Sequence, residues 1–278
     1  MSQLLHEVRP ALIIHCAAQP SHDLAKQRPF DDFDTNAVGT LNLLVAAQRY
    51  CPESSFVFMS TNKVYGDAPN EIPLVEKETR WDYAKREDYH GVDETCRIDA
   101  TLHSLFGASK VSADILVQEY GRYFGMPTVC FRAGCMTGRQ HAGAELHGFL
   151  AYVALATKQG RTYRIFGYKG KQVRDNIHAS DVVNACVAFH KSPRAAAVYN
   201  LGGGRKNSVS VVEAIGRFNY LLGKTLQTEY VHENRVGDHI CYISDTRKFE
   251  LDYPDWQITR SLDDIMRELA EVNSEVVN

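Results

Sequence analysis

Residues 11–18, ALIIHCAA, form an apolar run that ends in small residues, which predicts a buried β-strand leading into a tight turn. The stretch at 31–49, DDFDTNAVGTLNLLVAAQR, places apolar residues such as Val38 and Leu41 on one face and predicts a helix. The next apolar run, SFVFMST at 55–61, predicts a second strand. Strand, helix and strand in this order are the repeating unit of a mainly parallel sheet.

The same alternation continues with a helix predicted at 107–124 and a strand predicted at 128–134, TVCFRAG. We therefore expect an α/β fold, a Rossmann-like doubly wound parallel sheet with helices on both faces. Beyond residue 135 the alternation loosens, and the pattern predicts a smaller mixed α/β lobe. The expected division is a body over 1–135 and a lobe over 136–278, some of whose elements return to the body.

The composition argues against several classes of function. The 278 residues carry a net charge of −3, with 44% hydrophobic and 23% charged residues, which is typical of a globular domain rather than a nucleic-acid binder. No apolar run could span a bilayer, and Glu7 and Arg9 stand where a secretory signal needs apolar residues. Seven cysteines without a C-x-x-C pair indicate reduced thiols and a cytoplasmic location. We expect no membrane partner and no metal, because His141 and His178 lack suitably spaced partner ligands.

Six short segments stand out along the chain. They are HCAAQ (15–19), NAVGTLNLLVAA (36–47), STNKVYGD (60–67), SLFGASK (104–110), GKQVRDNIHASDVV (170–183) and NRVGDHICYISD (234–245). In this order they resemble the extended short-chain dehydrogenase/reductase family, and within it the NAD-dependent nucleotide-sugar epimerases and dehydratases. STNKVYGD and GKQVRD are most similar to 2-epimerases of CDP-linked deoxysugars. The resemblance implies an enzyme that uses NAD to epimerise a nucleotide-diphosphate sugar by transient oxidation and re-reduction.

The resemblance also implies a catalytic set. In the family a tyrosinate takes the proton of a sugar hydroxyl, a lysine four residues later lowers the tyrosine pKa, and a strand-end hydroxyl contacts the substrate oxygen. By position Lys110 is that lysine and Thr61 is that hydroxyl, although a solvated lysine and an ordinary strand-end threonine are the alternatives. The tyrosine position holds Phe106, whose ring has no proton to exchange.

Three explanations of Phe106 are open. Another group can replace the tyrosine, the chain can bind nucleotide-sugar or pair with an active homologue without catalysis, or the reaction can differ from that of the family. The candidates for replacement are Tyr65, Tyr89, His90, Asp93, Glu94 and a water held by Thr61. We favour replacement, because Thr61 and Lys110 would have little reason to remain beside an inactive site.

The binding residues implied by the resemblance fall into two sets. For NAD they are Ala17, Ala18, Gln19, Asn36, Ser60 and Lys110. Small residues at 17 and 18 would admit a flat ring, although close helix–strand packing explains them equally well. For the nucleotide-sugar they are Arg139, His147, Arg174, Arg235 and Asp238. Arginine suits a diphosphate because it binds phosphate bidentately, but Arg174 and Asp175 can instead form a structural ion pair.

The resemblance carries two further expectations. In this family the sheet order is 3-2-1-4-5-6-7, and ALIIHCAA corresponds to strand 4. No G-x-G-x-x-G turn is present, and the glycines at 202–204 are predicted to form a tight turn instead. We expect about 50–60 in-frame codons upstream to encode the first βαβαβ unit, without which the chain would bind dinucleotide poorly. Homodimers are expected through helices 31–49 and 107–124.

Overall fold

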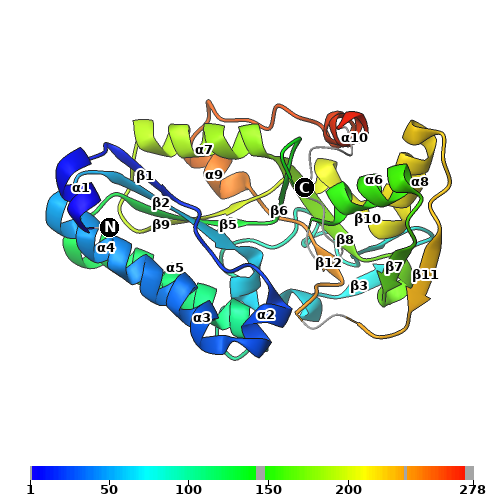
Figure 1. The fold of residues 1–278 in the computed structure, drawn as a ribbon, viewed down its shortest axis with the longest axis horizontal. Helices are drawn as coiled ribbons and strands as arrows, with labels where there is room; N and C mark the ends of the chain where they lie inside the picture. The colour runs from blue at the N-terminus through cyan, green and yellow to red at the C-terminus, as the bar shows by residue number, and fades with distance from the viewer. Residues whose placement is uncertain (1, 142–147, 235–236, 273–278) are drawn as a thin grey trace.

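The computed structural model describes residues 2–141, 148–234 and 237–272. A parallel sheet forms the body, with the strand order β1-β2-β5-β9 (Figure 1). Its strands are β1 Leu12–His15, β2 Ser55–Thr61, β5 Thr128–Ala133 and β9 Ala197–Leu201. Each neighbouring pair is parallel, which confirms the predicted fold class.

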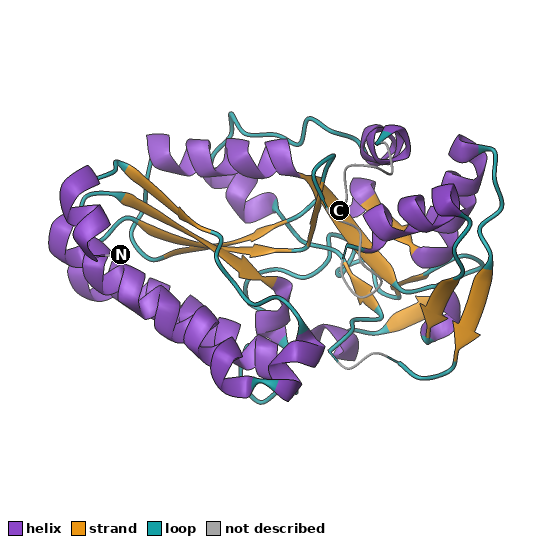
Figure 2. Ribbon diagram, in the orientation of Figure 1, coloured by secondary structure: helices purple, strands orange, loops and turns teal. Residues whose placement is uncertain are grey.

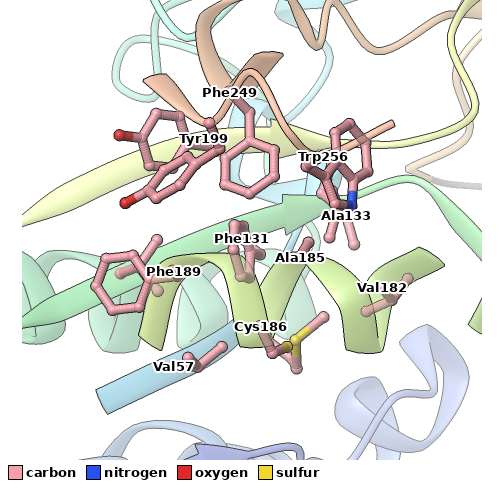
Figure 3. Packing of buried hydrophobic residues seen from close by; sticks show 14 of the residues in the cluster. Val57, Phe131, Ala133, Val182, Ala185, Cys186, Phe189, Tyr199, Phe249 and Trp256 are labelled. Carbon is pink, nitrogen blue, oxygen red and sulfur yellow. The ribbon is translucent and has the colours of Figure 1, made fainter. Parts of the chain in front are cut away.

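Helices cover both faces of this sheet (Figure 2). On one face lie α1 Ser2–Val8, α4 Gly39–Tyr50 and α5 Leu105–Phe124, and on the other α7 Ala179–Lys191 and α9 Arg247–Asp252. Because both faces are covered, every side chain of β5 is buried. Between the sheet and α9, the rings of Phe131 and Phe249 meet edge to face with centroids 5.4 Å apart (Figure 3).

The helix predicted at 31–49 contains one wider turn. The chain forms α3 Pro29–Phe33, then a π-helical turn Asp34–Val38, and then α4. Asn36 lies in this wide turn, and its side chain contacts the residues that follow β1. Wide turns of this kind are frequent at functional sites.

Short capped elements lie at the carboxyl edge of the sheet. α5 begins two residues before its predicted start, because the Ser104 hydroxyl accepts a hydrogen bond from Gly107 N at 3.0 Å. α2 His22–Gln27 follows β1 and is capped by Ser21. It is too short to produce an apolar periodicity in the sequence. A 3₁₀ turn, Asn62–Tyr65, follows β2.

Small sheets and three helices form the lobe within the described residues. β8 Val173–His178 pairs with β10 Ser208–Ser210, β12 Cys241–Tyr242 and β6 Cys135–Thr137. β7 Tyr163–Phe166 pairs with β11 Thr228–Val231, and β3 Leu74–Glu76 pairs with β4 Trp81–Tyr83. The helices are α6 Phe149–Gln159, α8 Val211–Leu222 and α10 Leu262–Glu271.

The segment 66–103, for which the sequence predicts a loop, contains the β3–β4 hairpin. The glycines at 202–204 form a close turn, since a Cβ added to Gly203 would lie 1.9 Å from the carbonyl oxygen of Asn176. We keep the division at residue 135 as a proposal, with the β3–β4 hairpin as an earlier element that packs with the lobe and β9, α7 and α9 as later elements that pack with the body. No described helix is both long enough and apolar enough to cross a membrane.

Candidate active site

The candidate site lies where the carboxyl ends of β1 and β2 meet the start of α5. Three segments far apart in the sequence converge there, namely the turn after β1, the end of β2 and the first turns of α5. In open parallel sheets this edge is where ligands bind, because the loops that follow the strands gather there.

Lys110 is a buried cation on α5. Its side chain is 3% exposed, Nζ donates to the main-chain oxygen of Met59 at 2.9 Å, and the ammonium lies 4.1 Å from the ring centroid of Phe58. Burial lowers the pKa of Lys110 to about 8, although Asp114 counteracts this shift. Lys110 is therefore not the solvated helix lysine that the sequence allowed as an alternative.

Thr61 is the last residue of β2 and is half-buried. Its Oγ1 accepts a hydrogen bond from Lys63 N at 3.2 Å and caps the 3₁₀ turn. Met59, which holds the Lys110 ammonium, lies two residues earlier on the same strand. The structure thus brings Thr61 and Lys110 to the same strand end.

Phe106 precedes Lys110 by one helical turn and is buried at 7% exposure. Its ring packs edge to face against His22, with centroids 5.0 Å apart. The sequence pattern did not indicate His22, because this residue lies 84 positions before Phe106. The sequence feature that could have drawn attention to His22 is its place directly after Ser21, a residue type that often caps helices.

The proposed replacement bases lie elsewhere. Tyr65 is fully buried, and its hydroxyl donates to Asn200 Oδ1 on β9 at 2.7 Å. Burial raises the pKa of Tyr65 well above its ordinary value. Glu94 Oε1 accepts from Asn200 N at 2.6 Å, and Tyr89 packs under the guanidinium of Arg205 at 4.3 Å. These side chains are directed to β9 and to the lobe rather than to Lys110.

His90 and Asp93 are exposed in the same segment of the chain. The His90 ring packs against that of Tyr89, with centroids 5.3 Å apart. Asp93 Oδ1 accepts hydrogen bonds from the main chain and hydroxyl of Thr95. Both residues thus make these contacts within the loop itself.

The turn after β1 is held by Asn36, which is 1% exposed. Its Oδ1 accepts Gln19 N at 2.9 Å, and its Nδ2 donates to Gln19 O at 3.1 Å and to Ser109 Oγ on α5 at 3.0 Å. The Gln19 side chain donates to Asp32 at 2.7 Å. Asn36 and Gln19 therefore order the turn, and they leave Ala17 and Ala18 exposed on it.

Ser60 has a structural contact. Its hydroxyl donates to Asp114 Oδ2 at 2.5 Å, and Asp114 also pairs with Arg132 at 2.8 Å. All three side chains are buried. The Ser60 hydroxyl is thus engaged in the core, and only its main chain remains for the predicted contact with a cofactor.

The predicted substrate residues are partly brought together. Arg174 on β8 pairs with Asp238 at 2.5 Å and also donates to Val173 O at 2.7 Å. The alternative pair of Arg174 with Asp175 does not form, because Asp175 accepts instead from Gly204 N at 3.0 Å. Burial raises the pKa of Asp175 to about 6.

Three predicted substrate residues lie outside this pair. Arg139 is exposed, and its main-chain N–H donates to Glu268 of α10 at 2.8 Å. His147 and Arg235 lie outside the described residues. Over residues 2–141, 148–234 and 237–272, no group of three or more histidine, cysteine, aspartate and glutamate side chains could hold a metal ion.

Comparisons with known proteins match most of the chain. The model of the NAD dependent epimerase/dehydratase family matches residues 1–202. CDP-paratose 2-epimerase of Salmonella typhi is 34% identical over 220 residues, covering 77% of this chain and 63% of that protein. dTDP-glucose 4,6-dehydratase 1 of Escherichia coli (strain K12) is 30% identical over 232 residues, covering 77% of this chain and 58% of that protein. The chain thus spans between 58% and 63% of the length of these two curated relatives.

A solved structure shares the fold. The structure of Thermus thermophilus UDP-glucose 4-epimerase in complex with NAD aligns with a TM-score of 0.77 at 24% identity. The alignment covers 97% of this chain and 79% of that one. The similarity therefore extends over both the body and the lobe.

Proposed function

The chain belongs to the NAD dependent epimerase/dehydratase family, and from this premise we propose that it epimerises one ring carbon of a nucleotide-diphosphate sugar by transient oxidation and re-reduction. The members of this family are enzymes. Because this chain is similar to CDP-paratose 2-epimerase, we propose a CDP-linked deoxysugar as its substrate. The proposed cofactor is NAD. The seven cysteines are all unpaired, which supports a reducing, cytoplasmic location.

The observation that carries the proposal is the position of Lys110. Its buried ammonium lies 2.9 Å from Met59 O, two residues before Thr61, and removing this charge from water costs free energy that the hydrogen bond offsets only in part. Perturbed cations in such positions are typical of sites that move protons. Lys110 and Thr61 together supply the positive charge and the hydroxyl that oxidation of an alcohol requires.

The turn after β1 supports the proposed cofactor. Ala17 and Ala18 are exposed and carry only methyl groups, so a flat ring system could approach the main chain. Asn36 and Gln19 keep that turn in one conformation, which lowers the entropy cost of binding. When bound, NAD supplies an acceptor and later a donor of hydride.

The residues of the chain would act on the sugar oxygen. The Thr61 hydroxyl can donate to this oxygen, since its contact with Lys63 N uses it as an acceptor and its contact with Asn62 Oδ1 is long, at 3.4 Å. The Lys110 charge stabilises the negative charge that develops when the oxygen loses its proton. Arg174 and Asp238, with Arg139, His147 and Arg235, remain the proposed contacts of the diphosphate and the sugar.

A second function is favoured by Phe106. Its ring cannot exchange a proton, so a non-catalytic member that binds nucleotide-sugar or pairs with an active homologue is the alternative. The epimerase is expected to form a product and the non-catalytic protein is not, but both are expected to bind nucleotide-sugar.

The test measures cofactor and product together. With NAD added in excess, we expect the protein to bind the cofactor, measured by equilibrium dialysis and absorbance, and to convert one CDP- or UDP-sugar to its epimer, followed by NMR in deuterated water. Bound NAD without turnover across the panel would favour the non-catalytic alternative. If the protein binds no NAD and forms no product, both functions are excluded.

We also propose a homodimer through the helices at 31–49 and 107–124. α4 and α5 pack side by side, and Val38 just before α4, Val45 on α4 and Ile115 on α5 are between 38% and 48% exposed. Val38 and Val45 are seven residues apart, so they share one helical face. Glutamate at position 45 would place a charge in the proposed interface.

We expect Val45→Glu to halve the mass measured by light scattering at micromolar concentration, because an unpaired buried charge is strongly unfavourable. The matched control is Val187→Glu on α7, which is 40% exposed on the opposite face of the sheet. Equal masses for the two variants would contradict the proposed interface.

A further inference from the structure

We propose that His22 is the general acid/base of this enzyme, in place of the tyrosine that the family has at position 106. This inference rests on the proposed function, and it adds a catalytic residue to the same site. Phe106 fills the volume of a phenol ring but lacks the hydroxyl, so this side chain cannot carry the proton. His22 packs directly against that ring.

The His22 ring is oriented by the cap of α5. Nδ1 lies 2.7 Å from Ser104 Oγ, and the same oxygen accepts Gly107 N at 3.0 Å. When Nδ1–H donates to Ser104, the second lone pair of the hydroxyl is used, and the ring exchanges its proton at Nε2. The Ser104 contact is then identical in the neutral and the protonated ring, so proton transfer needs no rearrangement there.

His22 also faces the predicted substrate segment. A Cβ added to Gly237 would lie 3.0 Å from Cε1 of His22, so the main chain next to Asp238 passes directly by the ring. Lys63, two residues after Thr61, donates to Gly237 O at 2.9 Å. The His22 ring therefore has the tyrosine position on one contact and, on another, the main chain next to Asp238, which pairs with Arg174.

The proton balance is simple. When bound, NAD would supply the acceptor and then the donor of the hydride that leaves and rejoins the sugar carbon. His22 Nε2 would take the proton as the hydroxyl O–H bond breaks in the oxidation half, and it would give the proton back to the same oxygen in the reduction half. The ring ends each cycle neutral, as it began.

The experiment compares His22→Asn with a histidine that makes the same contact elsewhere. Asparagine can keep the hydrogen bond to Ser104 but cannot transfer a proton. The control is His190→Asn, because His190 Nδ1 contacts Ser55 Oγ at 3.0 Å at the opposite end of β2. We expect His22→Asn to lower kcat by about 10²–10⁴-fold with KM little changed, and His190→Asn to leave both constants near their original values.

Two further readouts separate catalysis from a structural contact. When kcat/KM is plotted against pH, the change in kcat/KM between about pH 5 and 8 should be absent from His22→Asn. Adding Phe106→Tyr to His22→Asn should restore at least about tenfold of the lost rate, since a phenol returns to its usual position. A rate equal to that of His190→Asn, an unchanged profile, or a double variant no more active than His22→Asn would each overturn the assignment.

A binding measurement keeps the assignment testable if the wild type shows no turnover. With nitrogen-15-labelled histidine, the ring signals absent from His22→Asn identify His22. Adding CDP- or UDP-sugar should shift them and leave the His190 signals in place. Without turnover, such a shift would support His22 at the site while the proposed epimerisation fails, and no shift would overturn the assignment as well.

Discussion

Replacing Lys110 with methionine is expected to lower nucleotide-sugar turnover by about 10²–10⁴-fold, the range that a positioned acid/base system contributes. Methionine keeps most of the buried volume and removes the ammonium, with both its charge and its hydrogen-bond donors. Without the charge, only the Thr61 hydroxyl remains to stabilise the sugar oxygen when its proton leaves, and the carbonyl oxygen of Met59 loses its 2.9 Å donor.

The matched control is Lys158→Met on α6. Lys158 Nζ also donates to a main-chain oxygen, that of Leu269 at 2.8 Å, but it lies in the lobe. We expect its turnover per folded molecule to match that of the original protein. Turnover in Lys110→Met equal to that in Lys158→Met would remove Lys110 from the site.

The lowered pKa of Lys110 predicts how kcat and the free energy of unfolding each change with pH. Because the ammonium is lost above a pKa of about 8, kcat should fall as the pH rises through about 8, and Lys110→Met should not show this limb. Stability should move in the opposite direction. The unfolded chain binds this proton more tightly than the native protein, so the free energy of unfolding should rise with pH from about 8 to the ordinary lysine range.

Replacing Asp114 with alanine is expected to lower the free energy of unfolding by about 3–5 kcal/mol, the typical cost of breaking a buried ion pair. Asp114 is 0% exposed and Arg132 is 4% exposed. The change leaves the guanidinium of Arg132 buried without its carboxylate, and it removes the acceptor of Ser60 Oγ and of Gln118 Nε2. Urea denaturation followed by circular dichroism measures the loss.

Glu119→Ala is the control for this second prediction. Glu119 lies on the same helix and pairs with Arg122, but both side chains are substantially exposed. Exposed pairs contribute roughly 0–1 kcal/mol, so its effect should be small. If Asp114→Ala does not fold, Asp114→Asn, which keeps the shape and an acceptor, should fold with an intermediate loss. Equal stabilities of Asp114→Ala and Glu119→Ala would contradict the prediction.

Local patterns in the sequence located much of the fold. The strand predicted at 55–61 coincides with β2, and the strand predicted at 128–134 covers β5. Ser210 and Glu213, which have the S-x-x-E spacing of a capping box, cap the start of α8. These features depend on residues within a few positions of one another, so the order of side chains alone is enough to reveal them.

The order of motifs along the chain also indicated Thr61 and Lys110 as a pair, and in the structure the Lys110 ammonium reaches from α5 to the end of β2, where Thr61 lies. Their roles stay predictions. The sequence could not show that Arg174 pairs with Asp238, because the two residues lie 64 positions apart. Adjacent residues on a strand direct their side chains to opposite faces, so sequence neighbours on β8 cannot share one site.

The position of His22 is the feature of the candidate site that the sequence could least predict. Its contact with Phe106 joins residues 84 positions apart, and neither residue carries a local pattern that requires the other. Periodicity and caps act over a few residues and therefore appear in the order of amino acids. The groups available to replace a missing hydroxyl depend on how α2 packs against α5, which follows from burial of the whole body and becomes visible only in the folded chain.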